Sequence, residues 1–340
     1  MTSTAADVGR ETSPAPSNGP DRRRPPRRRT RAADRGLNRA FRHLATSAGT
    51  LILIALAAVA GFLLWQAWPA LTSSGSEISS KVSFFQGQSS LASYLGPLIF
   101  GTLLAAAVAL AVATPLAIGI ALFTSHYAPR RLAQLLGWVV DLLAAIPSVV
   151  YGLWGALVLA PAIQPVWQWL SDVLGWIPLF KGPAADPARV LMTVSLVLAV
   201  MILPIITAVS REVFLQTPKL HEEAALALGA TRWEMIRTAV LPFGRSGVVS
   251  AAMLGLGRAL GETMAVVMIL SPGLTYSFAL LLAGKQQTIA ANIALKYPEA
   301  NSLGMSTLMA TGLALFVITM VVNMASRWVV GRRKEFSGAN

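Results

Sequence analysis

Residues 222–242 read EEAALALGATRWEMIRTAVLP, a polar segment between two apolar stretches long enough to cross a membrane. Gly229 divides this segment, and glycine readily adopts the left-handed backbone conformation that ends a helix sharply. Thr231 and Glu234 follow with the spacing of a capping box, which predicts a second helix start. Pro242 is expected to end that helix, because proline lacks a backbone N–H. The segment is therefore predicted to form two short helices joined at Gly229.

The first of these helices is expected to begin at Thr217 and Pro218. A hydroxyl residue followed by proline is a typical helix start, since the hydroxyl caps free N–H groups and proline tolerates the first helical position. Two capped helices joined by glycine would form a compact projection able to enter a groove of another protein. From the residues alone, the alternative is an ordinary amphipathic helical hairpin that connects two membrane spans.

The composition is that of a membrane protein. Hydrophobic residues make up 54% of the 340 residues and charged residues 13%, against about 25% charged in soluble domains. Several charge-free runs exceed the ~20 residues that a helix needs to cross the hydrocarbon core. The sequence predicts an all-α polytopic membrane protein with six transmembrane helices, at about 46–68, 95–123, 132–160, 189–211, 246–271 and 305–328.

Positive charge is distributed unevenly between the predicted loops. Eleven arginines precede the first span, and 22 of the 28 Lys and Arg residues fall on one side once this end is placed in the cytoplasm. Cytoplasmic loops of membrane proteins carry the excess of Lys and Arg. Both termini are therefore expected in the cytoplasm, on the same side as residues 222–242.

Three regions are expected along the chain. Residues 1–44 are rich in Arg and Pro without apolar periodicity, which predicts a disordered cytoplasmic tail near anionic lipid head groups. Residues 45–332 form the transmembrane domain, with a cytoplasmic loop at 212–245, and residues 333–340 form a short cytoplasmic tail. The net charge of +13 does not predict nucleic-acid binding, because no binding motif or aromatic platform accompanies the arginines.

Cysteine is absent and the three histidines are scattered, so the sequence predicts no metal site and no thiol chemistry. No catalytic residue is predicted.

In the outer segment 161–188, Trp167, Leu170 and Leu174 recur at helical spacing, which predicts a short amphipathic helix in the head-group region. Contact with an extracytoplasmic partner is the alternative.

The fifth predicted span contains two charged residues, Arg258 and Glu262. An Arg in a spanning helix costs at least ~2.5–3.5 kcal/mol, so such residues line a cavity or meet a partner. Their four-residue spacing would place both on one helix face, and Gly257 and Gly261 form a Gly-x-x-x-Gly step that permits close helix packing. The segment is either a buried ion pair that orients the helix or a pathway for a solute.

An oxyanion would use every polar group of this span. The Arg258 guanidinium would give bidentate contact, and the Thr263 hydroxyl with freed backbone N–H groups would bind the remaining oxygens. Because Glu262 is a carboxylate, the anion should carry a proton of its own. Hydrogen phosphate does so at neutral pH and sulfate does not, which favours phosphate.

Pro147 lies within the third predicted span and is expected to bend it, since proline interrupts the helical hydrogen bonds. The bend would free a carbonyl near Ser148, whose hydroxyl is a second candidate ligand in the pathway. A simple kink is the alternative. Asp141, near the cytoplasmic end of the same span, is expected to be solvated or to pair with Arg130 or Arg131.

The segment at 222–242 resembles the cytoplasmic EAA loop of ABC importer permeases, which reads Glu-Ala-Ala, three residues, Gly, nine residues and Ile-x-Leu-Pro. The residues in register are Glu223, Ala224, Ala225, Gly229, Leu241 and Pro242, with Ala239 in place of Ile. The resemblance implies a coupling helix that enters a groove of an ATPase subunit, through Glu223, Ala224, Ala225, Gly229 and Arg232. The chain has no Gly-x-x-x-x-Gly-Lys-Ser/Thr motif, so partner subunits would use ATP and Mg, and this chain would not be an enzyme.

Two further segments resemble the phosphate-specific ABC importer permeases: GRALGETMAV at 257–266 and AIPSVVYG at 145–152. Together with TIAANIA at 288–294, they are similar to the PstC-type subunit rather than to its PstA-type partner. The resemblance covers about residues 45–332. It implies the six-helix fold of type I ABC importer permeases, also called MetI-like.

The resemblance also implies an assembly in the plasma membrane of a bacterium. Its partners would be a PstA-like permease subunit, two PstB-like ATPase subunits and a PstS-like phosphate-binding protein outside the membrane. The substrate pathway would include Arg258, Glu262, Thr263 and Ser148, with helix packing at Gly257, Gly261 and Pro147. An ABC permease for another oxyanion, such as molybdate or phosphonate, and an ion-driven carrier are the alternatives.

Overall fold

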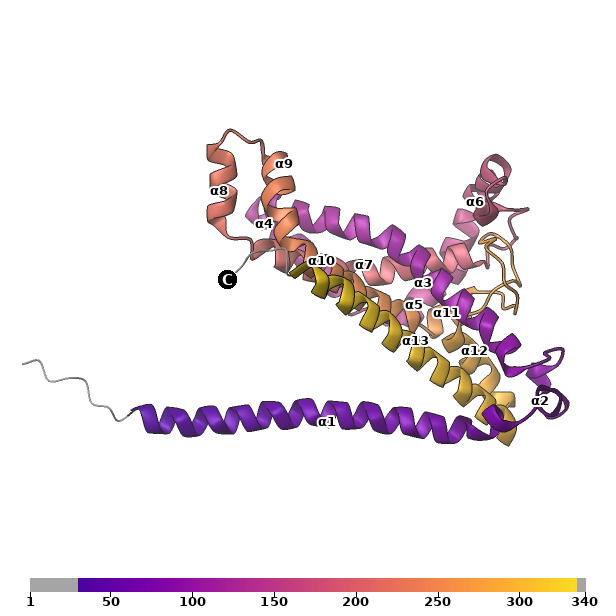
Figure 1. Cartoon of the computed structure of the whole chain (residues 1–340). Helices are drawn as coiled ribbons and strands as arrows, with labels where there is room; N and C mark the ends of the chain where they lie inside the picture. Colours follow the sequence, from indigo (N-terminus) through magenta and orange to yellow (C-terminus); the bar gives the residue numbers. More distant parts are fainter. Residues whose placement is uncertain (1–29, 335–340) are drawn as a thin grey trace, which may run out of the picture. The chain divides into compact units, whose positions relative to one another are not determined.

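The computed structural model describes residues 30–334, with side chains from residue 40 to residue 328. The chain divides into two compact units, residues 1–57 and 58–340, and each unit is described by itself. All regular structure in the described range is helical, as the sequence predicts (Figure 1).

The α-helices, in chain order, are α1 (Thr30–Thr72), α2 (Gly75–Lys81), α3 (Leu91–Leu122), α4 (Arg130–Ala144), α5 (Ser148–Trp154), α6 (Ala160–Leu174), α7 (Leu191–Leu215), α8 (Lys219–Ala227), α9 (Arg232–Met235), α10 (Leu241–Leu260), α11 (Met264–Ile269), α12 (Ile289–Lys296) and α13 (Ser302–Lys334). Turns of π-helix extend α3 (η2, Phe123–Tyr127), join α5 to α6 (η3, Gly155–Leu159) and join α9 to α10 (η5, Ile236–Val240). Short 3₁₀ turns are η1 (Ser83–Phe85), η4 (Pro178–Phe180) and η6 (Tyr297–Glu299).

Six helical segments of the described residues are long and apolar enough to cross a membrane: Ala40–Thr72, Leu91–Tyr127, Ser148–Leu174, Leu191–Leu215, Arg232–Leu260 and Ser302–Trp328. The number of spans agrees with the prediction. The first, second, fourth and sixth coincide with the predicted segments, whereas the third and fifth differ in where the helix breaks.

The first helix begins earlier than the sequence suggests. α1 starts at Thr30, so residues 30–44, for which the sequence predicts disorder, are helical. Residues 1–29 of the predicted tail, and residues 335–340 of the predicted C-terminal tail, lie outside the described residues.

The prediction that the third span, 132–160, is one bent helix is wrong. α4 ends at Ala144, and Pro147 is the N-cap residue of α5 with an extended backbone (φ −59°, ψ 140°). Proline disfavours the helical conformation in the residue before it and has no N–H to donate, so the helix separates in two. The freed carbonyl of Leu143 accepts a hydrogen bond from the Tyr151 hydroxyl at 2.9 Å. The spanning segment is instead 148–174.

The helix predicted in the outer segment is present, and it forms the last part of the apolar segment Ser148–Leu174. Trp167, Leu170 and Leu174 all lie in α6. The Trp167 side chain is buried, and its indole Nε1–H donates to the Thr193 hydroxyl on α7 at 2.9 Å. The hydrogen bond gives the buried indole N–H a partner and fixes this end of α6 against α7.

The fifth predicted span, 246–271, is also interrupted. α10 ends at Leu260, Gly261 forms a turn, and α11 begins only at Met264. At its other end the helix extends further than expected, because α9 continues through the π turn into α10. Pro242 lies at the start of α10 and does not end the helix, since proline is tolerated there and the π turn before it shifts the hydrogen-bond pattern.

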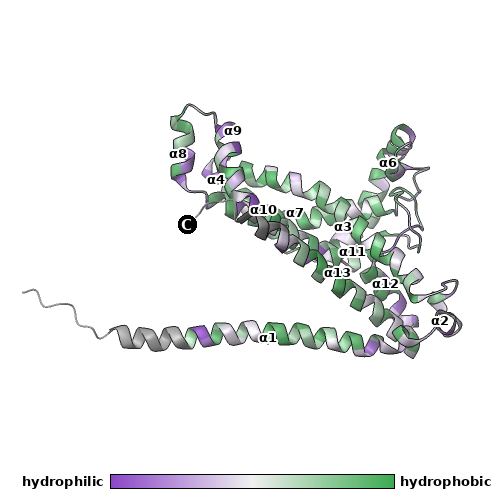
Figure 2. Cartoon of the chain, in the orientation of Figure 1, coloured by the Kyte–Doolittle hydropathy of each residue, from purple (hydrophilic) through white to green (hydrophobic). Residues whose placement is uncertain are grey.

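The core of the second unit forms where α3 packs along α7. On α3, buried alanines recur every four residues: Ala105, Ala109, Ala113, Ala117 and Ala121. Most of them belong to one cluster with the apolar residues of α7, and small side chains allow two helices to approach closely. Figure 2 shows apolar residues along these spans and a mixture of hydrophilic and apolar residues at α8 and α9.

Candidate functional site

The two helix breaks of the membrane domain lie side by side, because α5 packs against α11. A Cβ atom added at Gly152 would lie 2.9 Å from the Ala265 Cα, and one added at Gly155 would meet the Ile269 side chain. The contacts advance together along both helices, so α5 and α11 run parallel. Their N-terminal ends therefore open toward the same side of the bundle, where backbone N–H groups at helix starts carry partial positive charge.

Ser148 and Glu262 occupy these two ends. Ser148 is the first residue of α5, one turn before Gly152, which places it near the level of the α11 start. Glu262 is 8% exposed, and its Oε1 accepts a hydrogen bond from the Ala265 N–H at 3.1 Å. The buried carboxylate therefore caps α11, a role that sequence reasoning did not assign to it.

Arg258 lies in the last turn of α10 and is half-buried. It lies within electrostatic reach of the Tyr151 hydroxyl on α5. Within residues 40–328 no ion pair joins Arg258 to Glu262, because the helix ends between them and the expected shared face does not exist. The Thr263 hydroxyl donates to the Gly261 carbonyl at 3.2 Å. Arg258 on α10 thus lies near Tyr151 on α5. Glu262 and Thr263 instead make hydrogen bonds to backbone groups within three residues of themselves.

The predicted Gly-x-x-x-Gly seam is not used within the described part of this chain. Gly257 and Gly261 are exposed, and an added Cβ at either would meet no other helix within 4 Å. The glycine of α10 that permits close packing is Gly255, where an added Cβ would lie 2.8 Å from the Ile206 Cδ1 on α7. The exposed glycines leave one face of α10 open.

The polar loop after α7 has much of the predicted local geometry. Gly229 has φ +86° and ends α8, as expected for a left-handed turn. The capping box is confirmed: the Thr231 N–H donates to the Glu234 Oε2 at 2.8 Å, and the Glu234 N–H donates to the Thr231 Oγ1 at 3.3 Å. The predicted N-cap at Thr217 is wrong, since Pro218 takes that position without a side-chain bond.

The α8–α9 loop presents apolar side chains to solvent. The large exposed ones are Leu220 (76%), Leu226 (44%), Leu228 (90%) and Trp233 (55%). Glu223, Ala224 and Arg232 are exposed beside them, whereas the Ala225 methyl packs against the cluster that contains Met235 and Ile236. Large exposed apolar side chains gathered on one loop are typical of a surface that contacts another protein or a membrane.

Sequence reasoning missed the contact that connects α8 to the end of α3. The His126 Nε2 lies 3.6 Å from the Glu222 Oε1, and its Nδ1 lies 2.7 Å from the Ser125 Oγ. Both members of the His126–Glu222 pair are largely buried. The two residues are almost a hundred positions apart in the chain, and their pairing is fixed by the packing of the loop on the π turn after α3.

Comparison with known proteins gives a consistent result. Residues 113–335 match the family model described as binding-protein-dependent transport system inner membrane component. The phosphate transport system permease protein PstC 2 of Mycobacterium tuberculosis is 46% identical over 306 residues, covering 88% of this chain and 94% of the relative. PstC of Mycobacterium leprae is 47% identical over 277 residues (80% and 86%), and PstC of Xylella fastidiosa is 40% identical over 306 residues (87% and 91%). The chain belongs to the family of binding-protein-dependent transport system inner membrane components.

Proposed function

We propose that this chain is the PstC-type permease subunit of an ATP-driven phosphate importer and forms half of its transmembrane pathway. The observation that carries the proposal is the pair of adjacent helix breaks. Two helix N-termini with an arginine close by form an environment suited to an anion inside a membrane span. The relatives named as phosphate transport permeases support phosphate as that anion.

The residues at the breaks have distinct proposed roles. Arg258 attracts the anion and contacts its oxygens, because guanidinium binds oxyanions in bidentate fashion. The Ser148 hydroxyl donates to a further oxygen, and the Thr263 hydroxyl does so by exchanging its hydrogen bond to the Gly261 carbonyl. Glu262 holds the N-terminus of α11 and accepts a hydrogen bond from the protonated oxygen of hydrogen phosphate, which an unprotonated sulfate cannot donate.

The α8–α9 loop is proposed to transmit the motion of the ATPase. Its exposed apolar face and Gly229 turn suit insertion into a groove of a PstB-like subunit, where Glu223, Ala224, Ala225 and Arg232 complete the contact. ATP and Mg are used by two such subunits, and this chain is a membrane component rather than an enzyme. A PstA-like permease covers the open α10 face at Gly257 and Gly261, and a PstS-like binding protein delivers phosphate from outside.

The proposed location is the bacterial plasma membrane, with several spans and both termini in the cytoplasm. The distribution of Lys and Arg supports this orientation. It places the α8–α9 loop on the side of the membrane where ATP is present.

The experiment that tests the function compares anions in liposomes that contain the complete transporter. Phosphate with the binding protein should stimulate ATP hydrolysis and uptake, whereas sulfate, molybdate and phosphonate should not. Stimulation by one of the latter anions instead of phosphate would identify a different oxyanion permease. Phosphate uptake by this chain without ATPase subunits would contradict the proposal and favour an ion-driven carrier.

A further inference from the structure

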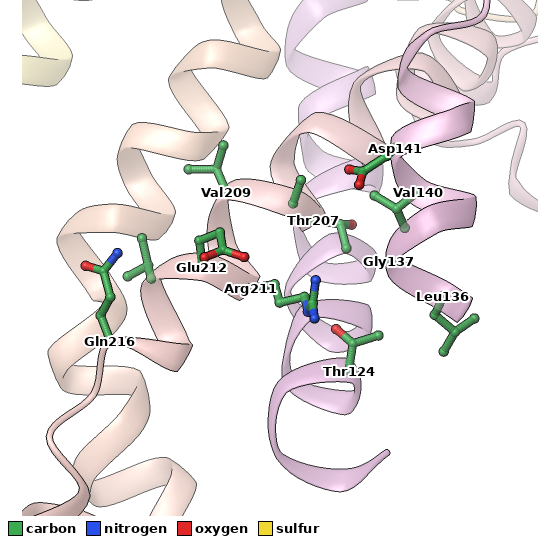
Figure 3. Close-up of a pocket in the computed structure, with 12 residues that line it drawn as sticks. Thr124, Leu136, Gly137, Val140, Asp141, Thr207, Val209, Arg211, Glu212 and Gln216 are labelled. Carbon is green, nitrogen blue, oxygen red and sulfur yellow. The ribbon is translucent and has the colours of Figure 1, made fainter. Parts of the chain in front are cut away.

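A cavity of about 390 Å³ lies between α4 and α7 at the end of α3 (Figure 3). Its lining residues come from three segments: Thr124, Leu136, Gly137, Val140, Asp141, Thr207, Ala208, Val209, Arg211, Glu212, Val213 and Gln216. The spans Leu91–Tyr127 and Leu191–Leu215 both end beside it, so the cavity is at a boundary of the membrane. None of these residues has a proposed role in the pathway or in ATPase coupling.

The guanidinium in the cavity lacks a partner for one of its donors. The Nε of Arg211 is buried and makes no hydrogen bond, and no ion pair of Arg211 is found among the described residues. Its guanidinium lies over Gly137, where an added Cβ would be 3.1 Å from the Nη1. Because an unpaired buried donor on a cation is costly, a bound acceptor would stabilise this arrangement.

A neutral donor in the same cavity is also unsatisfied. Thr207 is 1% exposed, and its Oγ1 makes no hydrogen bond. A buried hydroxyl normally finds a partner within the protein or in a bound molecule. Arg211 and Thr207 thus place two unsatisfied donors about one turn apart on α7, in the lining of the same cavity.

The cavity also contains two carboxylates, which restrict what this acceptor can be. Asp141 lies one turn after Gly137 on α4, and Glu212 follows Arg211 on α7; neither makes an ion pair within residues 40–328. A free phosphate dianion would be repelled by both carboxylates at short range. A ligand that carries a phosphate and an ammonium group would satisfy the guanidinium and the carboxylates together.

The rest of the lining is mostly apolar, with the side chains of Leu136, Val140, Ala208, Val209 and Val213. Such a surface beside charged groups at a membrane boundary matches the region of a phospholipid where acyl chains meet the head group. We infer that this cavity binds the head group of a zwitterionic aminophospholipid of the phosphatidylethanolamine class. The phosphate contacts Arg211 and Thr207, and the ammonium contacts Asp141 and Glu212. The assignment to the cytoplasmic leaflet rests on the orientation in the proposed function.

The test measures lipid binding without any transport. The complete transporter is purified, stripped of lipid and titrated with phosphatidylethanolamine, phosphatidylglycerol or inorganic phosphate, and bound lipid is counted by native mass spectrometry. The wild type should bind phosphatidylethanolamine about tenfold more tightly than phosphatidylglycerol, a difference that one hydrogen bond to a charged group supplies. Lipid binding and phosphate uptake are separate readouts, so the failure of either one is distinguishable from the failure of the other.

Three variants separate the contributions of the charged groups. Arg211→Gln should weaken phosphatidylethanolamine binding about tenfold, because the phosphate loses its charged donor. Combined Asp141→Asn and Glu212→Gln should reverse the preference toward phosphatidylglycerol, because the ammonium loses its partners and the anionic lipid is no longer repelled. Arg131→Gln, at an exposed position at the start of α4 outside the cavity, is the matched control and should leave the preference unchanged.

Three outcomes would overturn the inference: equal binding of both lipids by the wild type, undiminished lipid binding by Arg211→Gln, or displacement of the lipid by inorganic phosphate. Loss of preference in Arg131→Gln would also overturn it, since general surface charge would then explain the binding. If Arg211→Gln does not assemble, the two carboxylate substitutions decide alone, because Asp141 and Glu212 are exposed and make no ion pair within residues 40–328.

Discussion

Gly152 lies at a close approach between α5 and α11, the two helices that begin after the breaks. Its missing side chain allows the backbone of α11 to pass at a distance that no Cβ would tolerate, and this contact holds the N-termini of α5 and α11 beside each other. Arg258 adds a full positive charge near these helix starts, within electrostatic reach of Tyr151 on α5. The arrangement therefore depends on one small residue and one large charged residue, each with a different physical role.

Replacing Gly152 should separate the two helices. Gly152→Ala places a methyl group 2.9 Å from the Ala265 Cα, and such overpacking costs about 1–3 kcal/mol. The purified complex should melt at a lower temperature and lose phosphate uptake. The control is Gly119→Ala on α3, where an added Cβ meets nothing within 4 Å, so stability should be unchanged or slightly higher. Equal melting temperatures for the two variants would contradict the tight α5–α11 contact.

Arg258→Ala should abolish phosphate uptake while the complex still assembles. The variant removes the bidentate guanidinium, whose charge-assisted hydrogen bonds are worth at least about tenfold in affinity. Arg245→Ala is the matched control, because Arg245 is an exposed arginine of the same helix, far along the chain from the break. Uptake and subunit co-purification are measured for both. Normal uptake by Arg258→Ala would exclude Arg258 from the anion site.

At the scale of an element, the α8–α9 loop has a defined geometry that continues into a membrane span. Gly229 supplies its turn, the Thr231–Glu234 capping box begins its second helix, and η5 makes that helix continuous with α10. Pro242 lies in the first turn of α10, where it leaves this continuity intact. In the proposed function, a force applied to the loop would therefore reach Arg258 along one helix.

Gly229→Val should uncouple the ATPase from transport. The position has φ +86° and open space around it, so the cost is backbone strain of about 1–2 kcal/mol, without steric conflict. Gly87→Val, in the loop before α3, is the matched control, because Gly87 has φ +83° and equally open surroundings. Phosphate-driven ATP hydrolysis should fall for Gly229→Val and remain for Gly87→Val. The same loss in both variants would point to general destabilisation instead of coupling.

At the scale of the whole molecule, the proposed function requires the α8–α9 loop and the end of α6 to lie on opposite sides of the membrane. The span Ser148–Leu174 and the span Leu191–Leu215 run between these two regions. Leu228 is 90% exposed on the loop and Trp176 is 80% exposed just after α6. Each gives a surface position whose chemical accessibility reports its side.

Single-cysteine labelling tests this orientation directly, because the chain has no cysteine of its own. In intact cells, a membrane-impermeant maleimide should label Trp176→Cys at once and Leu228→Cys only after the membrane is opened. A cross-linker attached at Leu228→Cys should then capture the ATPase subunit. Labelling of Leu228→Cys in intact cells would reverse the orientation and remove the proposed energy source.

The sequence predicted those features that depend on neighbouring residues. The six apolar spans follow from composition and length, the Gly229 turn from the freedom of glycine, and the Thr231–Glu234 capping box from spacing alone. The same reasoning did not predict that a helix ends at Pro147 and at Gly261. A long apolar run has the hydropathy of one continuous helix even where the helix is interrupted. Hydropathy reports the solvent around a segment and not the path of its backbone.

By itself, then, the sequence determined a six-span helical protein with a polar loop that turns at a glycine, since these properties arise from local propensity and from the transfer of apolar residues into lipid. Only the tertiary structure decided that α5 and α11 run side by side, that His126 meets Glu222, and that Arg211 shares a cavity with two carboxylates. Each of these arrangements joins residues far apart in the chain. Their geometry depends on how whole helices pack, which no local pattern encodes.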